Sequence, residues 1–151
     1  MDNIILSQAK ELILQASVSK SYKEVTILAN ISSLIYNSYN DLNWAGFYYV
    51  DNNHFVLGPF QGRVACTNIP TSKGMLGKCY SINKTLVVDD VHKERAHIAC
   101  DSASNSELII PIYKNNKIYL LLDIDSPVFS RFTKSLIKEL EEISKLIEAA
   151  I

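Results

Sequence analysis

The stretch ELIIPIYKNNKIYLLLDID (residues 107–125) contains two runs of strand-forming residues, 107–114 and 117–125, with Asn115-Asn116 between them. Asparagine tolerates the left-handed backbone conformation that tight turns require. The stretch therefore predicts two neighbouring antiparallel strands joined by a turn.

The second strand of this pair carries two acids on one face. Asp123 and Asp125 are two residues apart in the chain, so their side chains point to the same side of the strand. A solvated strand end would account for them, but aspartate is a poor strand former. Close carboxylates raise one another's pKa, and a neutral carboxyl can give a proton to a substrate oxygen. The side chains expected on the opposite, apolar face are Ile118, Leu120, Leu122 and Ile124, whereas Tyr119 and Leu121 precede the acids on their own face.

Glu107, in the first strand, joins these acids only if the strand register is irregular. A simple two-residue turn at the paired asparagines would place Glu107 opposite Ile124, and directly opposite residues share a face. A pocket shared by the three acids requires one residue out of register. We therefore predict either an odd-length loop at 114–117 or a bulge near Pro111, because proline cannot donate to the strand ladder.

Apolar residues at helical spacing indicate three long helices around these strands. A capping box of Ser21 and Glu24 is expected at the start of the second helix, and Thr133 is expected to cap the last. The helices are predicted over 3–17, from Val25 to about 37, and from 133 to the end, with a shorter one over 75–82. Further strands are predicted over 44–50, 54–57, around 63–67 and 85–88. Gly58-Pro59 and Gln61-Gly62 are expected to end the second of these in an irregular connection, and residues 89–106 are predicted to form a long loop. This order predicts an α+β fold in one domain, 1–151, with an antiparallel sheet and the terminal helices on a single face.

Composition narrows the class of protein. The 15 basic and 16 acidic residues nearly balance, which argues against nucleic acid or an anionic membrane surface as a partner. No apolar run is long enough to span a bilayer, and the first residues, MDNIILSQAK, do not resemble a signal peptide. Three cysteines, an odd number, do not suggest a secreted domain held by disulfides. We therefore expect a cytoplasmic protein with reduced thiols.

The cysteines do not form a metal site by their spacing. Cys66, Cys79 and Cys100 contain no close pair, and the three histidines are scattered, so we predict no metal. Cys100 stands among polar residues, although unpaired cysteine usually prefers apolar neighbours. His97, three residues earlier, could favour a thiolate, whereas Asp101 opposes one. From the residues alone, a reactive Cys100 and a structural one both stay open.

Three segments resemble one known family. NWAGFYYVDNNHFVLGPFQGRVACTNIPTSKGMLG (43–77), VDDVHKERAHIACDSASNSELIIPI (88–112) and LLDIDSPVFSRF (121–132) are similar to the free methionine-(R)-sulfoxide reductases, which are single GAF domains. The likeness covers about residues 40–132. It implies a central antiparallel sheet with helices on one side and a ligand pocket under loops on the other.

The resemblance also implies a reaction and its thiols. Cys100, in HIACDS, corresponds to the nucleophile that attacks the sulfur of free methionine (R)-sulfoxide and becomes a sulfenic acid. Cys66, in GRVACT, corresponds to the resolving thiol that forms a disulfide with it. Thioredoxin is then the reductant that regenerates both thiols, no cofactor is implied, and a homodimer is compatible with the pattern.

The remaining site residues are implied in the same way. Glu107, Asp123 and Asp125 correspond to pocket carboxylates that bind the sulfoxide oxygen and the ammonium group. Trp44 corresponds to an aromatic residue that packs on the S-methyl group, and Tyr48 to a second aromatic residue of the pocket.

The sequence departs from the family at its third cysteine. That cysteine belongs to a G-x-C-G segment, and here Leu76 occupies its place in GMLG. Cys79 follows three residues later, about one helical turn away. It is either a partial substitute or, as we expect from the usual burial of free cysteine, a packing residue.

Two other functions remain compatible with the sequence. One is a GAF module that binds a small metabolite without turnover, since fold alone does not fix function. The other is a thiol switch that responds to peroxide, which needs Cys100 but no acid cluster. The joint presence of two cysteines and three acids favours the enzyme.

Overall fold

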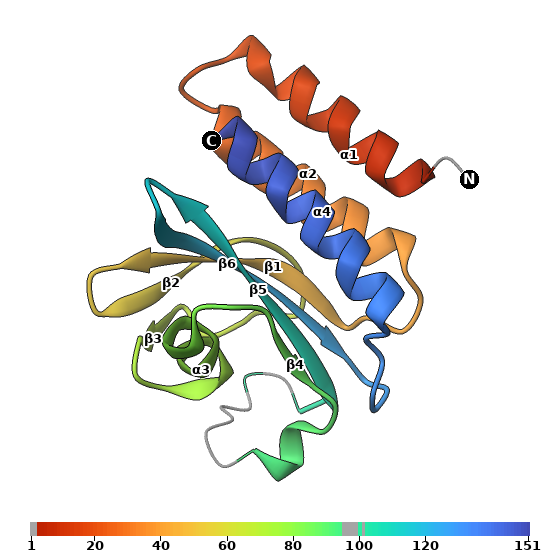
Figure 1. The fold of residues 1–151 in the computed structure, drawn as a ribbon, viewed down its shortest axis with the longest axis vertical. Coiled ribbons are helices and arrows are strands. Elements are labelled where there is room, and N and C mark those ends of the chain that lie inside the picture. The colour runs from red at the N-terminus through yellow and green to blue at the C-terminus, as the bar shows by residue number, and fades with distance from the viewer. Residues whose placement is uncertain (1–2, 95–99, 101) are drawn as a thin grey trace.

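Six antiparallel strands form one sheet in the computed structural model, which describes residues 3–94, 100 and 102–151. The two longest hairpins, β1–β2 and β5–β6, meet at the centre, where β1 pairs with β6 (Figure 1). The strands are β1 (Trp44–Asp51), β2 (His54–Gly62), β3 (Asn68–Pro70), β4 (Leu86–Val88), β5 (Ser106–Lys114) and β6 (Lys117–Ser126), in the spatial order β3-β2-β1-β6-β5-β4.

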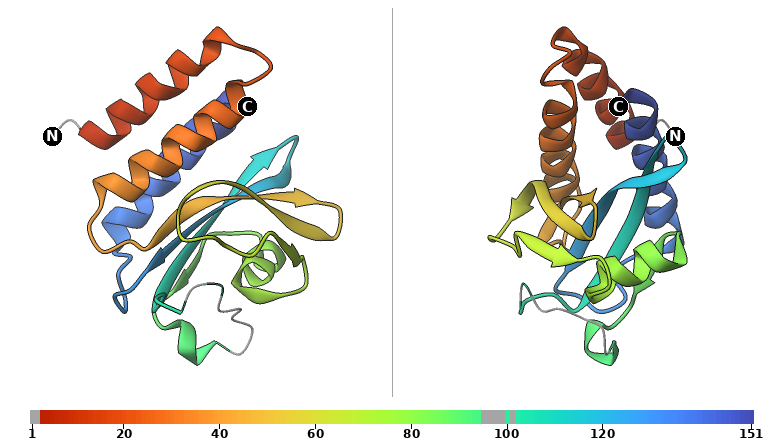
Figure 2. Two further views of the ribbon diagram at one scale, coloured as in Figure 1. Left: turned by 180° about the vertical axis from the view of Figure 1, so that it is seen from behind. Right: turned by 90° about the vertical axis from the view of Figure 1, so that its left-hand side faces the viewer.

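The long helices lie on one face of this sheet and a short helix on the other (Figures 1 and 2). α2 (Lys23–Ser38) and α4 (Lys134–Ala150) cover the sheet, and α1 (Ile4–Gln15) packs against both on the side away from it. Their apolar faces and one face of the sheet form the larger hydrophobic core. The short helix α3 (Gly74–Ile82) covers a second, smaller core on the opposite face. The α+β class and the single-sided packing of the terminal helices are thus confirmed.

The connecting segments include two short 3₁₀ turns, Ala16–Val18 and Val91–Lys93. No helix in the part of the chain that the structure describes is long and apolar enough to cross a membrane.

The β5–β6 hairpin contains the predicted irregularity. Asn115 and Asn116 have φ angles of 53° and 61°, so they form a two-residue turn of the type that suits a twisted hairpin. One step further, Ile112 pairs with Leu120 while Tyr113 pairs with Ile118, which leaves Tyr119 as an extra residue in β6. The predicted bulge is confirmed, but it lies in the partner strand rather than at Pro111, which pairs regularly with Leu121.

The bulge brings the acids into register. It also reverses the faces of the sheet that were expected for the side chains of Ile118 and Tyr119. Glu107 pairs with Asp125 instead of Ile124. Tyr119 packs in the larger core with the helices and Ile118 in the smaller core, the opposite of the alternation predicted from the sequence. The reason is that an extra residue shifts the two-residue period by one.

Two strand predictions need correction. β2 continues to Gly62, whereas Gly58-Pro59 and Gln61-Gly62 were expected to break it. It continues because Gly46 pairs with Phe60 and Tyr48 with Leu57, so Gly58 and Pro59 oppose a single residue of β1 in a bulge, where proline is tolerated. The strand expected around 63–67 is irregular chain, and β3 begins at Asn68 instead.

One of the two predicted helix caps is confirmed. The Thr133 side chain accepts a hydrogen bond from the Leu136 amide at 3.3 Å. The capping box at Ser21 is wrong, because α2 begins after Tyr22 without a side-chain cap. Glu24 instead accepts a hydrogen bond at 2.9 Å from the hydroxyl of Tyr119, which ties α2 to the bulge.

We expect deletion of Tyr119 to leave Glu107 paired with Asp125, because the shortened strand then alternates regularly. The protein should lose about 1–3 kcal/mol of unfolding free energy, since the bond to Glu24 and the packing of the ring are lost. Urea unfolding and a crystal structure of the variant check both expectations.

Deletion of Ile124 is the matched control, because it puts Asp123 and Asp125 on opposite faces of β6. Only that deletion should separate the acids. Finding them separated in the Tyr119 deletion would contradict the role assigned to the bulge.

Candidate active site

A small pocket opens on the face of the sheet that carries α3, opposite the long helices. Its cavity measures about 50 Å³, room for a few water molecules. Strands β1, β5 and β6 form its floor, and α3 and two loops form its walls. Its lining residues are Trp44, Tyr48, Val64, Ala65, Ile69, Lys73, Gly74, Met75, Leu76, Cys100, Ser104, Glu107, Asp123 and Asp125.

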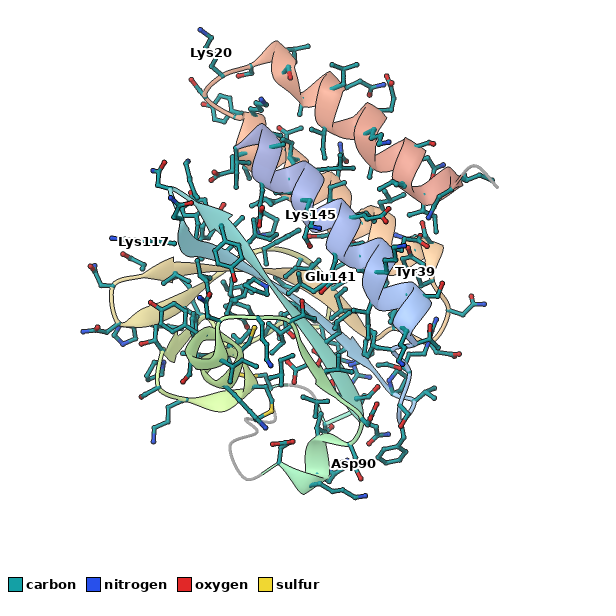
Figure 3. The ribbon with its side chains drawn as sticks, viewed as in Figure 1. Lys20, Tyr39, Asp90, Lys117, Glu141 and Lys145 are labelled. Carbon is teal, nitrogen blue, oxygen red and sulfur yellow. A yellow bond between two sulfur atoms is a disulfide. The ribbon has the colours of Figure 1, made fainter. Side chains whose placement is uncertain are left out.

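A disulfide between Cys66 and Cys100 stands at this pocket, with the Cα atoms 5.9 Å apart. It is the yellow bond in Figure 3. Cys66 is half-buried in the loop between β2 and β3, and Cys100 is exposed at the pocket. His97 and Asp101, considered above as influences on the Cys100 thiol, lie outside the described residues.

The three predicted acids converge on the pocket floor. Glu107 is 6% exposed, Asp123 is 7% exposed and Asp125 is half-buried. One oxygen of each lies within 4.8 Å of the others. Glu107 and Asp123 share a hydrogen bond, while Asp123 Oδ1 is buried with no other hydrogen-bond partner among the described residues. Unpaired buried carboxylate oxygens are costly, so this atom points to a ligand.

The environment of the acids favours the protonated form. Burial raises the pKa of Glu107 well above its usual range, and the charges of Asp123 and Asp125 raise it further. Burial also raises the pKa of Asp123, although its hydrogen bond with Glu107 works against this. The Glu107–Asp123 pair therefore holds a proton at a pH where exposed carboxyls have lost theirs. The same three oxygens have the spacing to hold a cation. Because the three residues are all carboxylates, they would suit a cation that prefers oxygen ligands rather than zinc.

Two aromatic rings of β1 form the wall next to the acids. Trp44 and Tyr48 are each 3% exposed, and their rings stack with centroids 5.9 Å apart. Phe60 of β2 also stacks on Trp44, with the ring centroids 5.2 Å apart. Burial raises the pKa of Tyr48, and the charges of Asp123 and Asp125 add to the effect, so its hydroxyl stays protonated.

The chain is similar to known proteins along most of its length, although no family model matches it. The free methionine-R-sulfoxide reductase of Escherichia coli (strain K12) is 46% identical over 123 residues, which are 77% of this chain and 74% of the relative. The chain belongs to the free methionine-R-sulfoxide reductase family.

Further members of this family agree in sequence and in structure. The free methionine-R-sulfoxide reductase of Saccharomyces cerevisiae is 42% identical over 128 residues, covering 80% of this chain and 71% of the relative. The reduced form of the Staphylococcus aureus enzyme superposes with a TM-score of 0.85 at 40% identity, over 99% of this chain and 96% of the other. The Neisseria meningitidis enzyme in complex with its substrate gives 0.82 at 32% identity, over 99% and 92%.

The structure clarifies the departure from the family at the third cysteine. Leu76 lines the pocket, so an apolar side chain occupies that position of the wall. Cys79 is fully buried, does not belong to the described lining, and donates a hydrogen bond to the Lys84 carbonyl at 3.3 Å. Burial raises the pKa of its thiol to about 12, with a further contribution from Asp123. These observations favour a packing role for Cys79.

Sequence reasoning missed the wall formed by the start of α3. Lys73, Gly74 and Met75 line the pocket, and no side chain caps this end of the helix. Gly74 has a φ angle of 69°, a conformation that favours glycine. A glycine immediately before an apolar helical run is a signal for a helix N-terminus that faces a ligand, and it could have directed attention here. Ser104 was also missed, and it accepts a hydrogen bond from the Asn43 amide at 3.0 Å.

We expect Glu107→Gln to stabilise the oxidised protein at alkaline pH. In the unfolded chain this carboxyl ionises near its ordinary pKa of about 4.3, whereas the folded protein keeps it protonated to a higher pH. The folded state then binds more protons, so the free energy of unfolding falls as the pH rises above that value. The glutamine amide does not ionise, so the variant does not lose unfolding free energy in this way. It should be more stable than wild type by about 1–3 kcal/mol at pH 8.

Urea unfolding of both proteins at pH 4 and pH 8 measures the difference, which should nearly vanish at pH 4. A wild-type stability that does not fall between these pH values would contradict the prediction.

Proposed function

We propose that this protein reduces free L-methionine (R)-sulfoxide to methionine. One observation carries the proposal: a cysteine pair that forms a disulfide stands at a pocket whose floor is three converging carboxyl groups. The free methionine-R-sulfoxide reductases that resemble this chain, one of them solved with its substrate, support the assignment.

The chemistry begins with Cys100 as the nucleophile. Its thiolate attacks the sulfoxide sulfur, while the proton held by Glu107 and Asp123 passes to the sulfoxide oxygen and makes the sulfur more electrophilic. The sulfoxide sulfur gains the two electrons that the Cys100 sulfur loses. Methionine leaves, and the oxygen and proton remain on Cys100 as a sulfenic acid.

Cys66 completes the cycle as the resolving thiol. Its thiolate attacks the Cys100 sulfenic sulfur, the S–S bond forms and the S–O bond breaks, and the oxygen leaves as water after taking up a proton. A dithiol reductant of the thioredoxin type then reduces the disulfide by exchange. We place the cycle in the cytoplasm, where thiols are kept reduced.

The charges of the pocket suit a free amino acid. An ammonium group would supply the partner that Asp123 Oδ1 lacks and would neutralise Asp125. The sulfoxide oxygen then faces Glu107, and the S-methyl group packs on the rings of Trp44 and Tyr48.

Replacing each of the two cysteines should block a different step of the reaction. Cys100→Ser should abolish methionine release, because a hydroxyl at neutral pH is a far weaker nucleophile than a thiolate. Cys66→Ser should release about one equivalent of methionine and then stop, with Cys100 left oxidised. Rapid-quench measurement of methionine, beside the steady-state rate with thioredoxin and its reductase, separates the two. Steady-state turnover at the wild-type rate in Cys100→Ser would refute the assignment.

Substrates without the ammonium charge should be poor. N-acetyl-methionine sulfoxide leaves the buried acids without a partner, at a cost of about 1–3 kcal/mol for an unsatisfied group. We expect kcat/KM for it to be lower by about tenfold or more, since 1.4 kcal/mol corresponds to a factor of ten. The comparison uses both sulfoxide epimers of the free and the acetylated compound. Equal rates on free and acetylated (R)-sulfoxide would exclude ammonium recognition by the acids.

A further inference from the structure

Two pocket aromatics also hold the loop that carries Cys66. The Tyr48 hydroxyl donates a hydrogen bond to the Cys66 carbonyl at 2.8 Å. The Trp44 indole N–H donates to the Arg63 carbonyl at 3.1 Å. Both donors belong to β1 and both rings are almost fully buried, so the two bonds anchor the loop to the rigid centre of the sheet.

The loop is irregular between its two ends. It leaves β2 at Gly62, whose φ of 127° and close approach to Trp44 bring the chain against the indole; a Cβ there would lie 2.7 Å from Trp44 Cδ1. It rejoins the sheet where the Leu57 amide donates to the Thr67 carbonyl. Between these points Val64 is 88% exposed, whereas Ala65 and Cys66 are half-buried against the smaller core. The two hydrogen bonds from β1 therefore add to this partial packing in fixing the position of Cys66.

We propose that the Tyr48 hydroxyl is a positioning group for Cys66, holding its loop where the Cys66 sulfur can reach Cys100. The proposal rests on the function above, in which Cys66 is the resolving thiol. It adds a second role to Tyr48, whose ring faces the substrate while its hydroxyl acts on the thiol that follows in the cycle.

Geometry explains why positioning matters for this step. A disulfide requires Cα atoms about 4.4–6.8 Å apart, and the two cysteines meet this condition at 5.9 Å. A free five-residue loop would satisfy it only part of the time. The hydrogen bond and the disulfide restrict the same loop, so each lowers the entropic cost of forming the other.

The covalent step leaves the Tyr48 proton in place. The Cys66 thiolate attacks the sulfenic sulfur of Cys100, and the departing oxygen takes a proton to leave as water. The Tyr48 hydroxyl keeps its proton and its hydrogen bond to the Cys66 carbonyl throughout, because its raised pKa keeps it a donor. Tyr48 is therefore not an acid or base in resolution.

The test compares Tyr48→Phe with Tyr49→Phe. The first keeps the pocket ring and removes only the hydroxyl. The second removes a hydroxyl from the neighbouring residue, whose ring packs on the helix side of the sheet. Each protein is equilibrated in glutathione redox buffers without methionine sulfoxide, and the fraction with the Cys66–Cys100 disulfide is measured by mass spectrometry after acid quench and thiol alkylation.

We expect Tyr48→Phe to lower the equilibrium constant for disulfide formation about three- to tenfold, the factor that one net hydrogen bond supplies. Tyr49→Phe should stay within about twofold of wild type, a free-energy change below that of a typical hydrogen bond. An equal loss of stability in the reduced and oxidised forms cancels in this ratio, so a merely structural role of Tyr48 would not move it. After one turnover with methionine sulfoxide, Tyr48→Phe should also retain Cys100 sulfenic acid longer, as detected with dimedone.

An equilibrium constant for Tyr48→Phe equal to that of Tyr49→Phe would overturn the inference. Failure of the proposed function would look different. The wild-type protein would then leave methionine sulfoxide unchanged, while its disulfide would still depend on Tyr48 in the glutathione buffers.

Discussion

The pairing of Glu107 with Asp125 across β5 and β6 determines the chemistry of this site. With a two-residue turn and a β6 strand of this length, the pairing requires that Tyr119, between the turn and the acids, be accommodated as a bulge. If every residue of β6 were instead paired regularly, Glu107 would face the helices and the pocket would have two acids instead of three. The bulge is held from the other face of the sheet, where Tyr119 bonds to Glu24 of α2 and packs edge-on against Tyr49. The helix layer thus fixes a register that is used on the far side of the sheet.

Burying the acids costs stability, and in the proposed mechanism it provides the reactive proton. Glu107 and Asp123 are more than nine-tenths buried, and one oxygen of Asp123 has no hydrogen-bond partner among the described residues. The fold tolerates this cost because each face of the sheet has its own apolar core, which together surround the strands that carry the acids. In the proposed mechanism, the carboxyl pair keeps a proton in the pocket that Cys100 also lines, for transfer to the sulfoxide oxygen. The cavity of about 50 Å³ belongs to the form with the disulfide closed, and a free amino acid requires more room than this.

Much of this arrangement could be predicted from the sequence, and the failures have identifiable causes. The apolar period of α4 and its Thr133 cap are local signals, and both hold. Counting along the hairpin was enough to predict a bulge, because the period of a strand is strict. Counting could not predict which strand would contain the bulge, because that depends on the hydrogen bond between Tyr119 and Glu24 of a helix distant in sequence. The same contact explains why Glu24 does not close a capping box.

Other features depended on tertiary structure from the start. Gly58 and Pro59 predicted a break in β2, but they form a bulge opposite β1 and the strand continues. The wall formed by Lys73 and Met75 becomes visible only when α3 is folded over the sheet. The bonds from Trp44 and Tyr48 to the Cys66 loop join segments that no local pattern connects. Residue type and spacing predicted the cysteines and acids that meet at the pocket, whereas the hydrogen bonds that hold the Cys66 loop required coordinates.

The central claim is that the acid cluster holds a proton, for transfer to a sulfoxide oxygen, at a pH where exposed carboxyls have lost theirs. A carbon-13 NMR titration of the Glu107 side-chain carboxyl, assigned by comparison with Glu107→Gln, tests it most directly. The account predicts that this carboxyl ionises well above its ordinary pKa and that its titration is coupled to that of Asp123. A Glu107 carboxyl that ionises independently, near the ordinary value of about 4.3, would contradict it.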